Sequence, residues 1–429
     1  MIYYLYNIFR VVIYPIVRHL LPLVSKKAKA RVEFEHNNLL RRPLLERADF
    51  AFEVSSEGEL EQVYPLIQSL INRHKTIELV YASESVDEKI KALVKKYPQQ
   101  VRSFILPILG YQPWSKFHNV RLWLTAEHLF LCRYDFFPEL IDYGIRKSKT
   151  FNLISASLKG QESKNFLAKA YYKWCIKSFD KIVAVSQVEK NKLINDLSVS
   201  AKSIEVFDFR ILQISNRLQS CEETLDHSWP LWHKFRDILN NRSHEEKKKK
   251  LILGSYWSEE FELIKGLSAN TILTIVPHQL KKEKIENLKA KMEQENIPFF
   301  ELTKETDCID PEFKGVYLIN LKGILCELYS LFDIAYVGGG FGSSVHSVLE
   351  PYMANCKVFT GPKIHRSSEF DIIRDYDSDS IKSYNDLNAV VEDIKNMETS
   401  DTASKHFMRH FEGHIDAIEL WLGISQENK

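Results

Sequence analysis

Short apolar runs rich in β-branched residues alternate with helical patterns along most of this 429-residue chain. Parallel strands need crossover connections, usually helices, and strands covered on both faces read as continuous apolar runs. The alternation therefore predicts an α/β fold with parallel sheets covered by helices. The expected strands are Phe50–Val54, Ile77–Ala82, Val101–Leu106, His128–Arg133, Asn152–Ala156, Lys181–Val185, Ile204–Phe207, Lys250–Leu253, Thr271–Val276, Val316–Ile319, Ile334–Val337 and Cys356–Phe359.

The strands form two series, separated by a stretch near 211–249 in which the periodicity fades. Two such series predict two Rossmann-like domains, and two sheets of this kind facing each other would form a cleft at the carboxyl ends of their strands. The expected order along the chain is a membrane-associated helix with a basic exit (1–30), a first domain (31–215), a linker (216–249), a second domain (250–400) and a C-terminal helix (401–429).

Charge and cysteine usage exclude several classes of protein. Lys and Arg number 58 against 57 Asp and Glu, and a net charge of +1 provides no overall basic field for nucleic acid. The six cysteines are scattered, without a C-x-x-C pair or histidines at zinc spacing. This pattern predicts free thiols in a reducing compartment.

The first 24 residues are strongly apolar, but Arg10 and Arg18 interrupt them, so they do not read as an uninterrupted membrane span. On a helix, Asn7, Arg10 and Arg18 share one narrow stripe, and Pro15 and Pro22 are expected to kink or break the helix. Four basic residues follow, Lys26, Lys27, Lys29 and Arg31. We expect this helix to lie in a bilayer face with anionic headgroups; the alternative is a helix buried against the protein's own core.

The segment Ser55 to Glu59 follows the first expected strand and opens a helix. Serine is a favoured N-cap, Gly58 allows a ligand or another chain to approach the backbone, and Glu59 falls in the first turn, where the helix dipole favours its ionised form. Such a carboxylate can accept a proton from a hydroxyl nucleophile. The alternative is a capping carboxylate without chemistry, which is the commoner role of a first-turn glutamate.

Glycine is scarce, with 15 residues in the chain, yet four of them lie within 338–342, directly after a strand. The segment lacks the G-K-[ST] of a P-loop and fails the dinucleotide fingerprint. Backbone N–H groups such as those of Gly339 and Gly340 are expected to bind phosphate at the start of a helix. His346 and Glu350, spaced i, i+4, are expected on one face of that helix, with Glu350 binding ribose hydroxyls. The loop containing Gly254 and Ser255 also leads from a strand into a helix, and the N-terminus of this helix is a second expected anion-binding site.

Across nearly the whole chain these motifs resemble the 3-deoxy-D-manno-oct-2-ulosonic acid (Kdo) transferases, glycosyltransferases of the GT-B architecture that attach Kdo to lipid A precursors. Residues 56–59 match the family's S-x-G-E, 134–138 an acidic and aromatic segment, and 180–186 a D-x-x-x-A-x-S strand. Residues 254–257 match a G-S-T/Y-W element, and the most specific match runs from 328 through the glycine cluster to 362.

The resemblance implies transfer of Kdo from CMP-Kdo to a lipid A precursor hydroxyl, with inversion, in lipopolysaccharide core biosynthesis. It implies a peripheral or monotopic protein at the cytoplasmic face of the bacterial inner membrane, held by residues 1–24, without a nucleic acid partner. Glu59 would be the base and Asp135 a second catalytic residue. No metal would be required, because CMP is a comparatively good leaving group. The nucleotide-sugar-binding residues would be Gly254, Ser255, His278, Glu327, Gly339, Gly340, His346, Ser347 and Glu350.

The chain departs from the family pattern in places. The Arg that commonly follows Pro277 is replaced by His278, so that His278 or Lys363 would have to contact the donor phosphate, and Ser347 stands where Asn is common. Two alternatives therefore stay open: a GT-B transferase for another nucleotide sugar, and a catalytically inactive, membrane-associated binding protein.

Overall fold

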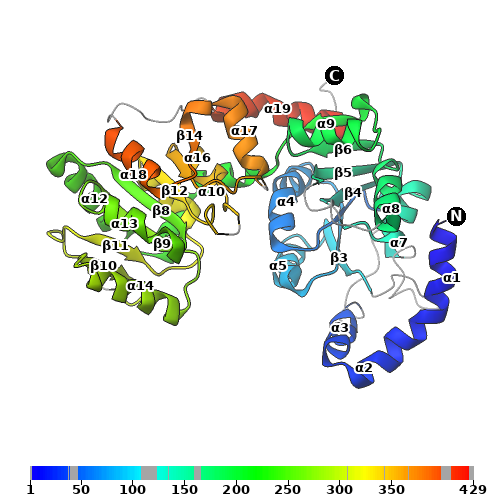
Figure 1. The fold of residues 1–429 in the computed structure, drawn as a ribbon. Coiled ribbons are helices and arrows are strands. Elements are labelled where there is room, and N and C mark those ends of the chain that lie inside the picture. Colours follow the sequence, from blue (N-terminus) through cyan, green and yellow to red (C-terminus); the bar gives the residue numbers. More distant parts are fainter. Residues whose placement is uncertain are drawn as a thin grey trace. The chain divides into compact units, whose positions relative to one another are not determined.

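The computed structural model describes residues 2–36, 38, 47–107, 123–133, 135–158, 166–306, 308–342, 344–365, 367–397 and 407–424. The chain forms two compact α/β units, the first made of Met1–Gln213 with His414–Lys429 and the second of Ile214–Gly413 (Figure 1). Each unit is built on its own sheet of seven described strands. The α/β class predicted from the alternating pattern is confirmed.

The sheet of the first unit consists of β1 (Phe50–Glu53), β2 (Ile77–Tyr81), β3 (Val101–Ile105), β4 (His128–Cys132), β5 (Thr150–Ala156), β6 (Lys181–Ala184) and β7 (Ile204–Val206). The strand order is β3-β2-β1-β4-β5-β6-β7, and all pairs are parallel. The topology reverses between β1 and β4, which is where open α/β sheets place their ligands. The start of α4 (Glu57–Asn72), which contains Glu59, and the loop that contains Asp135 follow β1 and β4 at this point.

The sheet of the second unit consists of β8 (Lys250–Tyr256), β9 (Ile272–Pro277), β10 (Phe299–Leu302), β11 (Val316–Ile319), β12 (Ile334–Val337), β13 (Lys357–Thr360) and β14 (Ile381–Ser383). Its order is β10-β11-β9-β8-β12-β13-β14, again parallel, and it reverses between β8 and β12. All twelve expected strands are present. The two that the sequence analysis missed, β10 and β14, are the edge strands, and most of their residues are only partly buried, which weakens the apolar signal.

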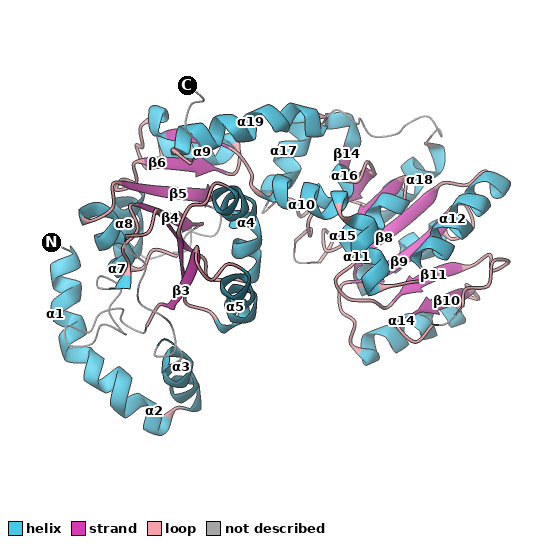
Figure 2. Ribbon diagram, turned by 180° about the vertical axis from the view of Figure 1, so that it is seen from behind, coloured by secondary structure: helices cyan, strands magenta, loops and turns pink. Residues whose placement is uncertain are grey.

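Helices cover both faces of each sheet (Figure 2). In the second unit, alternate strand residues face opposite sides, so that Ile252 and Tyr317 belong to one apolar core while Leu253 and Leu318 belong to another. The helices of the first unit are α1 (Ile2–Pro15), α2 (Leu21–Val24), α3 (Lys26–His36), α4 (Glu57–Asn72), α5 (Asp87–Lys96), α7 (Pro138–Arg146), α8 (Phe166–Ile176) and α9 (Gln187–Asn195). They are followed by α10 (Arg210–Gln219), α11 (Cys221–Ser228), α12 (Trp232–Glu246), α13 (Phe261–Leu267), α14 (Lys282–Gln294), α15 (Leu325–Leu328), α16 (Leu349–Met353), α17 (Ser368–Tyr376), α18 (Leu387–Asn396) and α19 (Phe407–Leu422).

Residues 216–249, expected as a linker, form the end of α10 together with α11 and α12, and they contribute to the core of the second unit. Trp232 and Phe235 of α12 are buried in the same cluster as Ile272 of β9. The charged side chain of Arg242 is buried in α12 as well, and this weakens the apolar periodicity of the helix in the sequence.

The C-terminal helix α19 packs its described end on the first unit. Ile418 and Leu422 are buried, and Glu419 accepts a hydrogen bond from Arg73 at 2.7 Å. Residues 414–424 therefore belong to the fold of the first unit, although they follow the whole second unit in sequence.

The N-terminal helices turn their polar stripe towards the protein. Arg10 pairs with Glu139 at 3.2 Å and Arg18 pairs with Glu35, and both arginines are buried. Tyr14, one turn from each arginine, is buried on the same stripe. The stripe expected from the sequence is thus present, but it faces the protein and leaves the apolar sides of the helix exposed.

Pro15 changes the type of helix rather than ending it. The chain passes from α1 into a π-helix over Ile16–Leu20 and then into α2, whose first turn contains Pro22. No helix in the described part of the chain is both long enough and apolar enough to cross a bilayer.

Arg31, expected to face lipid headgroups, instead binds the protein. Its guanidinium donates to the carbonyl oxygens of Ala82 and Leu106, which directly follow β2 and β3, and it pairs with Glu35 at 3.0 Å. Carbonyl groups in partly buried positions need donors, and Arg31 supplies them. The other members of the basic exit, Lys26, Lys27 and Lys29, are exposed.

All six cysteines are free thiols, as the sequence predicts.

Candidate functional site

Glu59 is the third residue of α4 and lies just beyond the carboxyl end of β1. The N-cap of α4 is Ser56, whose hydroxyl accepts a hydrogen bond from the Glu59 N–H at 3.3 Å. Glu59 Oε2 accepts a hydrogen bond from the Ser55 N–H at 2.7 Å, and within the described residues Oε1 has no hydrogen-bond partner. Glu59 is therefore a capping carboxylate that still has an oxygen available to take up a proton.

The surroundings of Glu59 raise the pKa of its carboxyl group above the ordinary value. Burial is the largest cause, and the negative charge of Asp135 adds to it, while hydrogen bonding from Ser55 and the charge of Arg133 act in the opposite direction. The two residues expected to be catalytic thus lie close enough to interact, because β1 and β4 are adjacent strands. A raised pKa makes Glu59 a stronger base at neutral pH.

A further carboxyl group, Glu53 at the end of β1, lies beside this pair and was missed by the sequence analysis. Its side chain is fully buried, and the Ser55 hydroxyl donates to its Oε1. No described residue donates to its Oε2. The signal that could have revealed it is an acidic residue inside the otherwise apolar strand Phe50–Glu53.

In the second unit, the Gly339 N–H already has a partner inside the protein. It donates to Glu260 Oε1 at 2.9 Å, and this fully buried carboxylate also accepts from the Trp257 N–H and the Tyr336 hydroxyl, each at 3.0 Å. An internal carboxylate therefore occupies the place where the sequence analysis expected the phosphate of a ligand. Its pKa is raised by burial, against the effect of these hydrogen bonds.

The clustered glycines allow close packing of backbone segments. A Cβ atom on Gly340 would lie 2.6 Å from the Gly361 nitrogen, and one on Gly254 would lie 2.0 Å from the Tyr329 hydroxyl oxygen. Gly339 has a φ of +93°, a conformation that side chains rarely adopt. The scarce glycines thus build the shape of the loop as well as its backbone donors.

His346 lies in the loop before α16 and not on the helix. Because α16 begins at Leu349, His346 and Glu350 do not share a helical face, and that expectation is wrong. The His346 N–H donates to the Gly338 carbonyl oxygen at 3.3 Å, which ties the loop back to the end of β12. Glu350 is partly exposed in the first turn of α16.

Three rings from the loops after β8, β9 and β12 form a stack. The ring centroid of His278 lies 4.1 Å from that of His346 and 4.7 Å from that of Trp257. The Trp257 indole N–H donates to His346 Nε2 at 3.2 Å, so this nitrogen carries no proton. Burial lowers the pKa of both histidines, and the charge of His278 lowers that of His346 further.

The start of α16 is also capped from within. The Ser347 hydroxyl and the N–H groups of Val348 and Leu349 donate to one oxygen of Glu369 at 2.9, 2.8 and 3.1 Å. Glu369 is buried, so the helix start that the sequence assigned to phosphate is occupied by a carboxylate of the same chain.

Glu327 is buried and makes a bidentate ion pair with Arg217 of α10. Its two oxygens accept from Nε and Nη2 of Arg217 at 2.8 Å each, the strong geometry for this pair. Burial lowers the pKa of Arg217, but the bond to Glu327 more than offsets this and the net shift is upward. Both oxygens of Glu327 are therefore bonded to Arg217, a residue that the sequence analysis did not identify.

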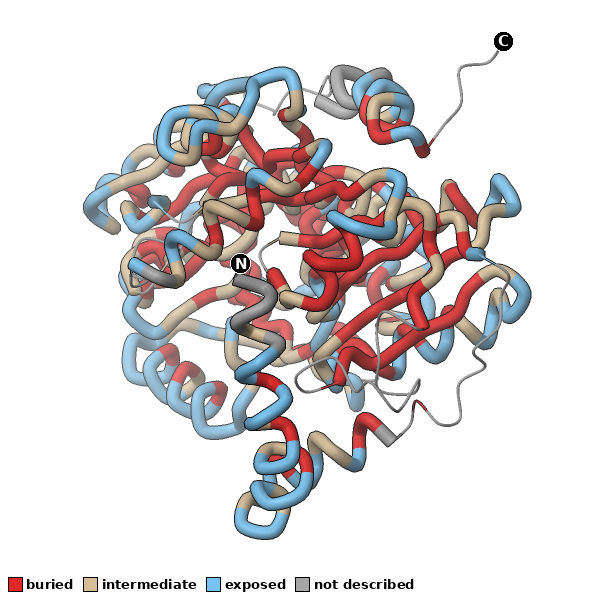
Figure 3. The backbone as a smooth tube through the Cα atoms, turned by 90° about the vertical axis from the view of Figure 1, so that its right-hand side faces the viewer, coloured by how far each residue is buried: buried red, intermediate tan, exposed pale blue. Residues whose placement is uncertain are grey.

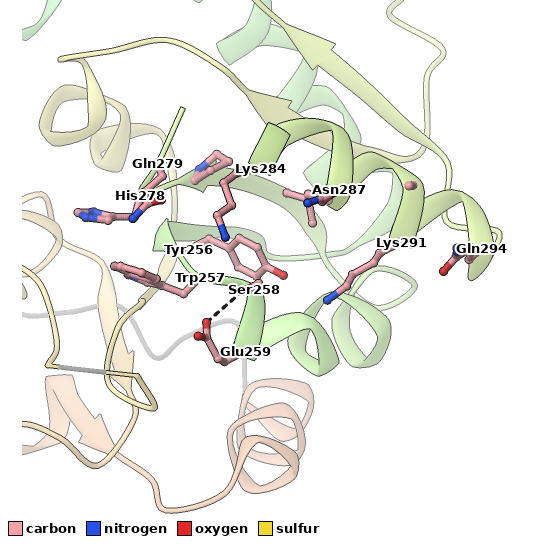
Figure 4. A pocket seen from close by; sticks show the side chains of 13 residues that line it. Tyr256, Trp257, Ser258, Glu259, His278, Gln279, Lys284, Asn287, Lys291 and Gln294 are labelled. Atoms are coloured by element: carbon pink, nitrogen blue, oxygen red, sulfur yellow. Dashed lines mark hydrogen bonds between the residues drawn. The ribbon is translucent and has the colours of Figure 1, made fainter. Parts of the chain in front are cut away.

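A cavity of about 520 Å³ opens beside the ring stack (Figure 4). Trp257 and His278 line one side, and Lys284, Asn287 and Lys291 of α14 line another. Figure 4 shows the Lys284 side chain extending from α14 towards the loop after β8. Two ammonium groups beside an aromatic surface suit a ligand with both negative charge and a flat ring.

The two residues expected to replace the missing Arg are placed differently. His278 lines the cavity, whereas the Lys363 ammonium donates to the Gly342 carbonyl oxygen. Over the described ranges, no group of three His, Cys, Asp or Glu side chains could hold a metal ion. Two members of the sequence motifs, Tyr134 and Ser343, lie outside the described residues.

A family model described as 3-Deoxy-D-manno-octulosonic-acid transferase (kdotransferase) matches residues 26–208, which contain Glu59 and Asp135. A 3-deoxy-D-manno-octulosonic acid transferase of Rickettsia felis is 21% identical over 325 residues, covering 73% of this chain and 64% of that protein. A 3-deoxy-D-manno-octulosonic acid transferase of Chlamydia muridarum is 28% identical over 218 residues, covering 46% of this chain and 47% of that protein. The chain thus spans between about half and two thirds of the length of these two relatives.

Two solved structures resemble the fold. A glycosyltransferase from Rickettsia africae has a TM-score of 0.54 at 12% identity, covering 90% of this chain and 100% of that chain. A UDP-GlcNAc 2-epimerase from Methanocaldococcus jannaschii has a TM-score of 0.55 at 10% identity, covering 86% of this chain and 99% of that chain. At these identities the likeness shows the fold alone, which is GT-B-like. Residues 26–208 thus match the Kdo transferase family model, these curated relatives are 3-deoxy-D-manno-octulosonic acid transferases at 21–28% identity, and the fold is GT-B-like.

Proposed function

We propose that the protein is an inverting transferase that moves Kdo from CMP-Kdo to a hydroxyl group of a lipid A precursor. The observation that carries the proposal is Glu59, the last residue of the S-x-G-E motif. It lies inside the region matched by the family model, and within the described part of the chain one of its oxygens is unbonded. Relatives from Rickettsia and Chlamydia carry the name of this transferase.

In the proposed reaction, Glu59 takes the proton of the acceptor hydroxyl while the hydroxyl oxygen bonds to the anomeric carbon of Kdo. The bond from that carbon to the phosphate oxygen breaks, and its electron pair leaves with CMP. Attack from the side opposite to CMP inverts the anomeric configuration. The raised pKa of Glu59 strengthens it as the acceptor of this proton. Asp135 supports the reaction by raising that pKa.

We assign the donor to the second unit. The stack of Trp257, His278 and His346 offers a flat surface for a ring of CMP-Kdo, and Lys284 and Lys291 offer positive charge for its phosphate and carboxylate. Glu350 of α16 is proposed to bind the ribose hydroxyls, as the sequence analysis expects. Cations of this kind can stabilise the leaving CMP, so the proposal includes no metal ion.

Product mass spectrometry tests this function. The protein is incubated with CMP-Kdo and a tetra-acylated lipid A precursor, and we expect the precursor mass to rise by one or more Kdo units as CMP is released. Stabilisation against heat by UDP-sugars and not by CMP would instead identify a transferase for another nucleotide sugar. Binding of the lipid without release of CMP would identify an inactive binding protein.

We further propose that α1 and α2 hold the protein on the cytoplasmic face of the bacterial inner membrane. Much of the N-terminal helical segment is coloured as exposed in Figure 3. Its large apolar side chains expose 41 to 84% of their surface: Ile8, Phe9, Val11, Val12, Ile16, Leu20, Leu21, Leu23 and Val24. Large exposed apolar patches mark membrane or protein contact sites. Burying such a surface in a bilayer is favourable by about 25 cal/mol per Å², and exposed lysines in the following helix add attraction to anionic headgroups.

Vesicle sedimentation tests the membrane contact. Replacing Phe9 and Val12 with Glu, or deleting residues 1–24, is expected to reduce binding to anionic vesicles at least tenfold, which corresponds to about 1.4 kcal/mol. The matched control replaces Ile145 and Leu420 with Glu. These apolar side chains are exposed elsewhere on the first unit, so this control should leave vesicle binding unchanged. Equal partitioning of the truncated and full-length proteins would contradict the proposal.

A further inference from the structure

The first unit contains a carboxyl group that the proposed reaction does not yet use. Glu53 is the last residue of β1, its side chain is fully buried, and its Oε2 has no hydrogen-bond partner among the described residues. Leaving a buried polar atom without a partner costs stability. A purely structural role therefore does not account for Glu53, since an apolar residue would serve this strand better.

Ser55 connects Glu53 to Glu59 through two hydrogen bonds. The Ser55 hydroxyl donates to Glu53 Oε1, and the Ser55 N–H donates to Glu59 Oε2 at 2.7 Å. A side-chain bond that fixes Ser55 also limits how its backbone N–H can move. The direction in which Ser55 holds the Glu59 carboxylate is thus set partly by Glu53.

Several titratable groups face Glu53. Burial raises the pKa of Glu53 well above its ordinary value, and the charges of Glu59 and Asp135 raise it further, against the hydrogen bond from the Ser55 hydroxyl and a smaller effect of the nearby Cys132 backbone. The Cys132 thiol, also buried, has a raised pKa and stays neutral. Arg133 acts on Glu59 and on Cys132. Since two adjacent carboxylates do not both ionise readily, Glu53 keeps its proton when Glu59 is ionised.

We propose that Glu53 is a positioning residue for Glu59: a neutral carboxylic acid that holds Ser55, so that Ser55 holds the base in the orientation that accepts the proton of the acceptor hydroxyl. This inference rests on the proposed transferase function. It assigns to Glu53 no contact with the substrate and no transfer of its own proton.

CMP release by full-length variants tests the positioning role. Glu53→Gln keeps an uncharged acceptor for Ser55, so its kcat should stay within about threefold of the wild type. Glu53→Ala removes the acceptor and should lower kcat about tenfold or more, with the KM for CMP-Kdo within about twofold. The control is Glu78→Gln, since Glu78 is equally buried on the neighbouring strand β2 but binds Arg102 and Thr125. This control should lower the thermal stability and leave kcat per folded molecule unchanged.

The pH profile gives a readout that a structural role would not move. If Glu53 is neutral, Glu53→Gln leaves the acid limb of the pH dependence of kcat/KM in place. A shift of that limb to lower pH would show that an ionised Glu53 had been raising the pKa of Glu59, and it would overturn the inference. A kcat for Glu53→Ala equal to that of the wild type would overturn it as well.

Thermal unfolding tests the neutral state without any substrate. A carboxyl group with a raised pKa in the folded protein contributes stability below its unfolded pKa of about 4.3, and this contribution is lost as the pH rises towards the folded pKa. Glu53→Gln lacks this loss, so its Tm relative to the wild type should increase between pH 5 and pH 8. If the Tm difference between Glu53→Gln and the wild type does not change with pH, the inference about Glu53 is wrong. If the wild type releases no CMP, the proposed function is wrong.

Discussion

Buried carboxyl groups beside the loops that follow the strands are bonded differently in the two units. In the second unit Glu260, Glu327 and Glu369 are buried, and each accepts two or three hydrogen bonds. In the first unit Glu53 and Glu59 each have an oxygen for which no described residue provides a donor. Satisfied carboxylates shape loops, whereas unsatisfied ones lower stability and are retained where chemistry uses them. The difference predicts which substitutions alter activity and which alter folding.

The largest effect is expected at the unsatisfied group of the first unit. Glu59→Gln should lower kcat by about 10²- to 10⁴-fold, the usual contribution of a general base, or about 3–5 kcal/mol. Thermal stability should stay equal or rise, because the change removes a negative charge near Asp135. CMP release and the Tm measure the two effects. Unchanged turnover would remove Glu59 as the base.

The next effect is expected at a satisfied carboxylate of the second unit. Glu260→Ala leaves the N–H groups of Trp257 and Gly339 and the Tyr336 hydroxyl without their acceptor, and should lower the free energy of unfolding by about 3 kcal/mol. Denaturant unfolding measures the change. Glu259→Ala, at an exposed neighbour, is the control and should stay within about 0.5 kcal/mol of the wild type. Equal stability of the two variants would contradict the role given to Glu260.

Glycines extend the comparison to the backbone. Gly340→Ala places a Cβ against the backbone of Gly361 and should destabilise by about 1–3 kcal/mol. Gly58→Ala meets no atom within 4 Å, and alanine favours a helix, so it should stabilise by about 0.5–1 kcal/mol. If the acceptor approaches the Gly58 backbone as the sequence analysis expects, the more stable variant should also turn over more slowly. If Gly58→Ala is less stable than the wild type, the space around Gly58 at the start of α4 is not open, which contradicts this prediction.

The smallest effect concerns the histidines of the ring stack. Their pKa values are lowered in the folded protein, so their contribution to stability is present above the unfolded pKa of about 6.5 and is lost as the pH falls through it. Between pH 7 and pH 5.5 we expect a loss of less than about 1 kcal/mol. His346→Asn should show a shallower fall of Tm over this range than the wild type. An identical slope would mean that His346 does not contribute.

The position of Glu59 could be predicted from sequence because its signals are local. An apolar strand, a serine N-cap and a first-turn glutamate occur within ten residues of one another. Glu260 and Glu369 could not be found in this way, since they bind N–H groups 79 and 21 residues away along the chain. In the sequence, both loops resemble phosphate-binding sites with free N–H groups. In the folded protein, these carboxylates bind those N–H groups.

The N-terminal helix shows the same limit. The stripe of Arg10 and Arg18 follows from helical geometry alone. The side that faces the protein is decided by Glu139 and Glu35, the first of which lies 129 residues away in the sequence. Periodicity therefore identifies two faces of a helix, and the buried partners determine which face is turned to solvent.

The return of α19 to the first unit affects how the chain is made. Arg73 leaves the ribosome early, but its partner Glu419 follows only after the whole of Ile214–Gly413. At roughly 5–20 residues per second, synthesis of the intervening unit takes on the order of 10–40 s. By the end of this time the second unit has its full sequence, while the first still lacks the segment that covers Ser69 and Arg73. The unit whose synthesis begins first is thus the last to be completed.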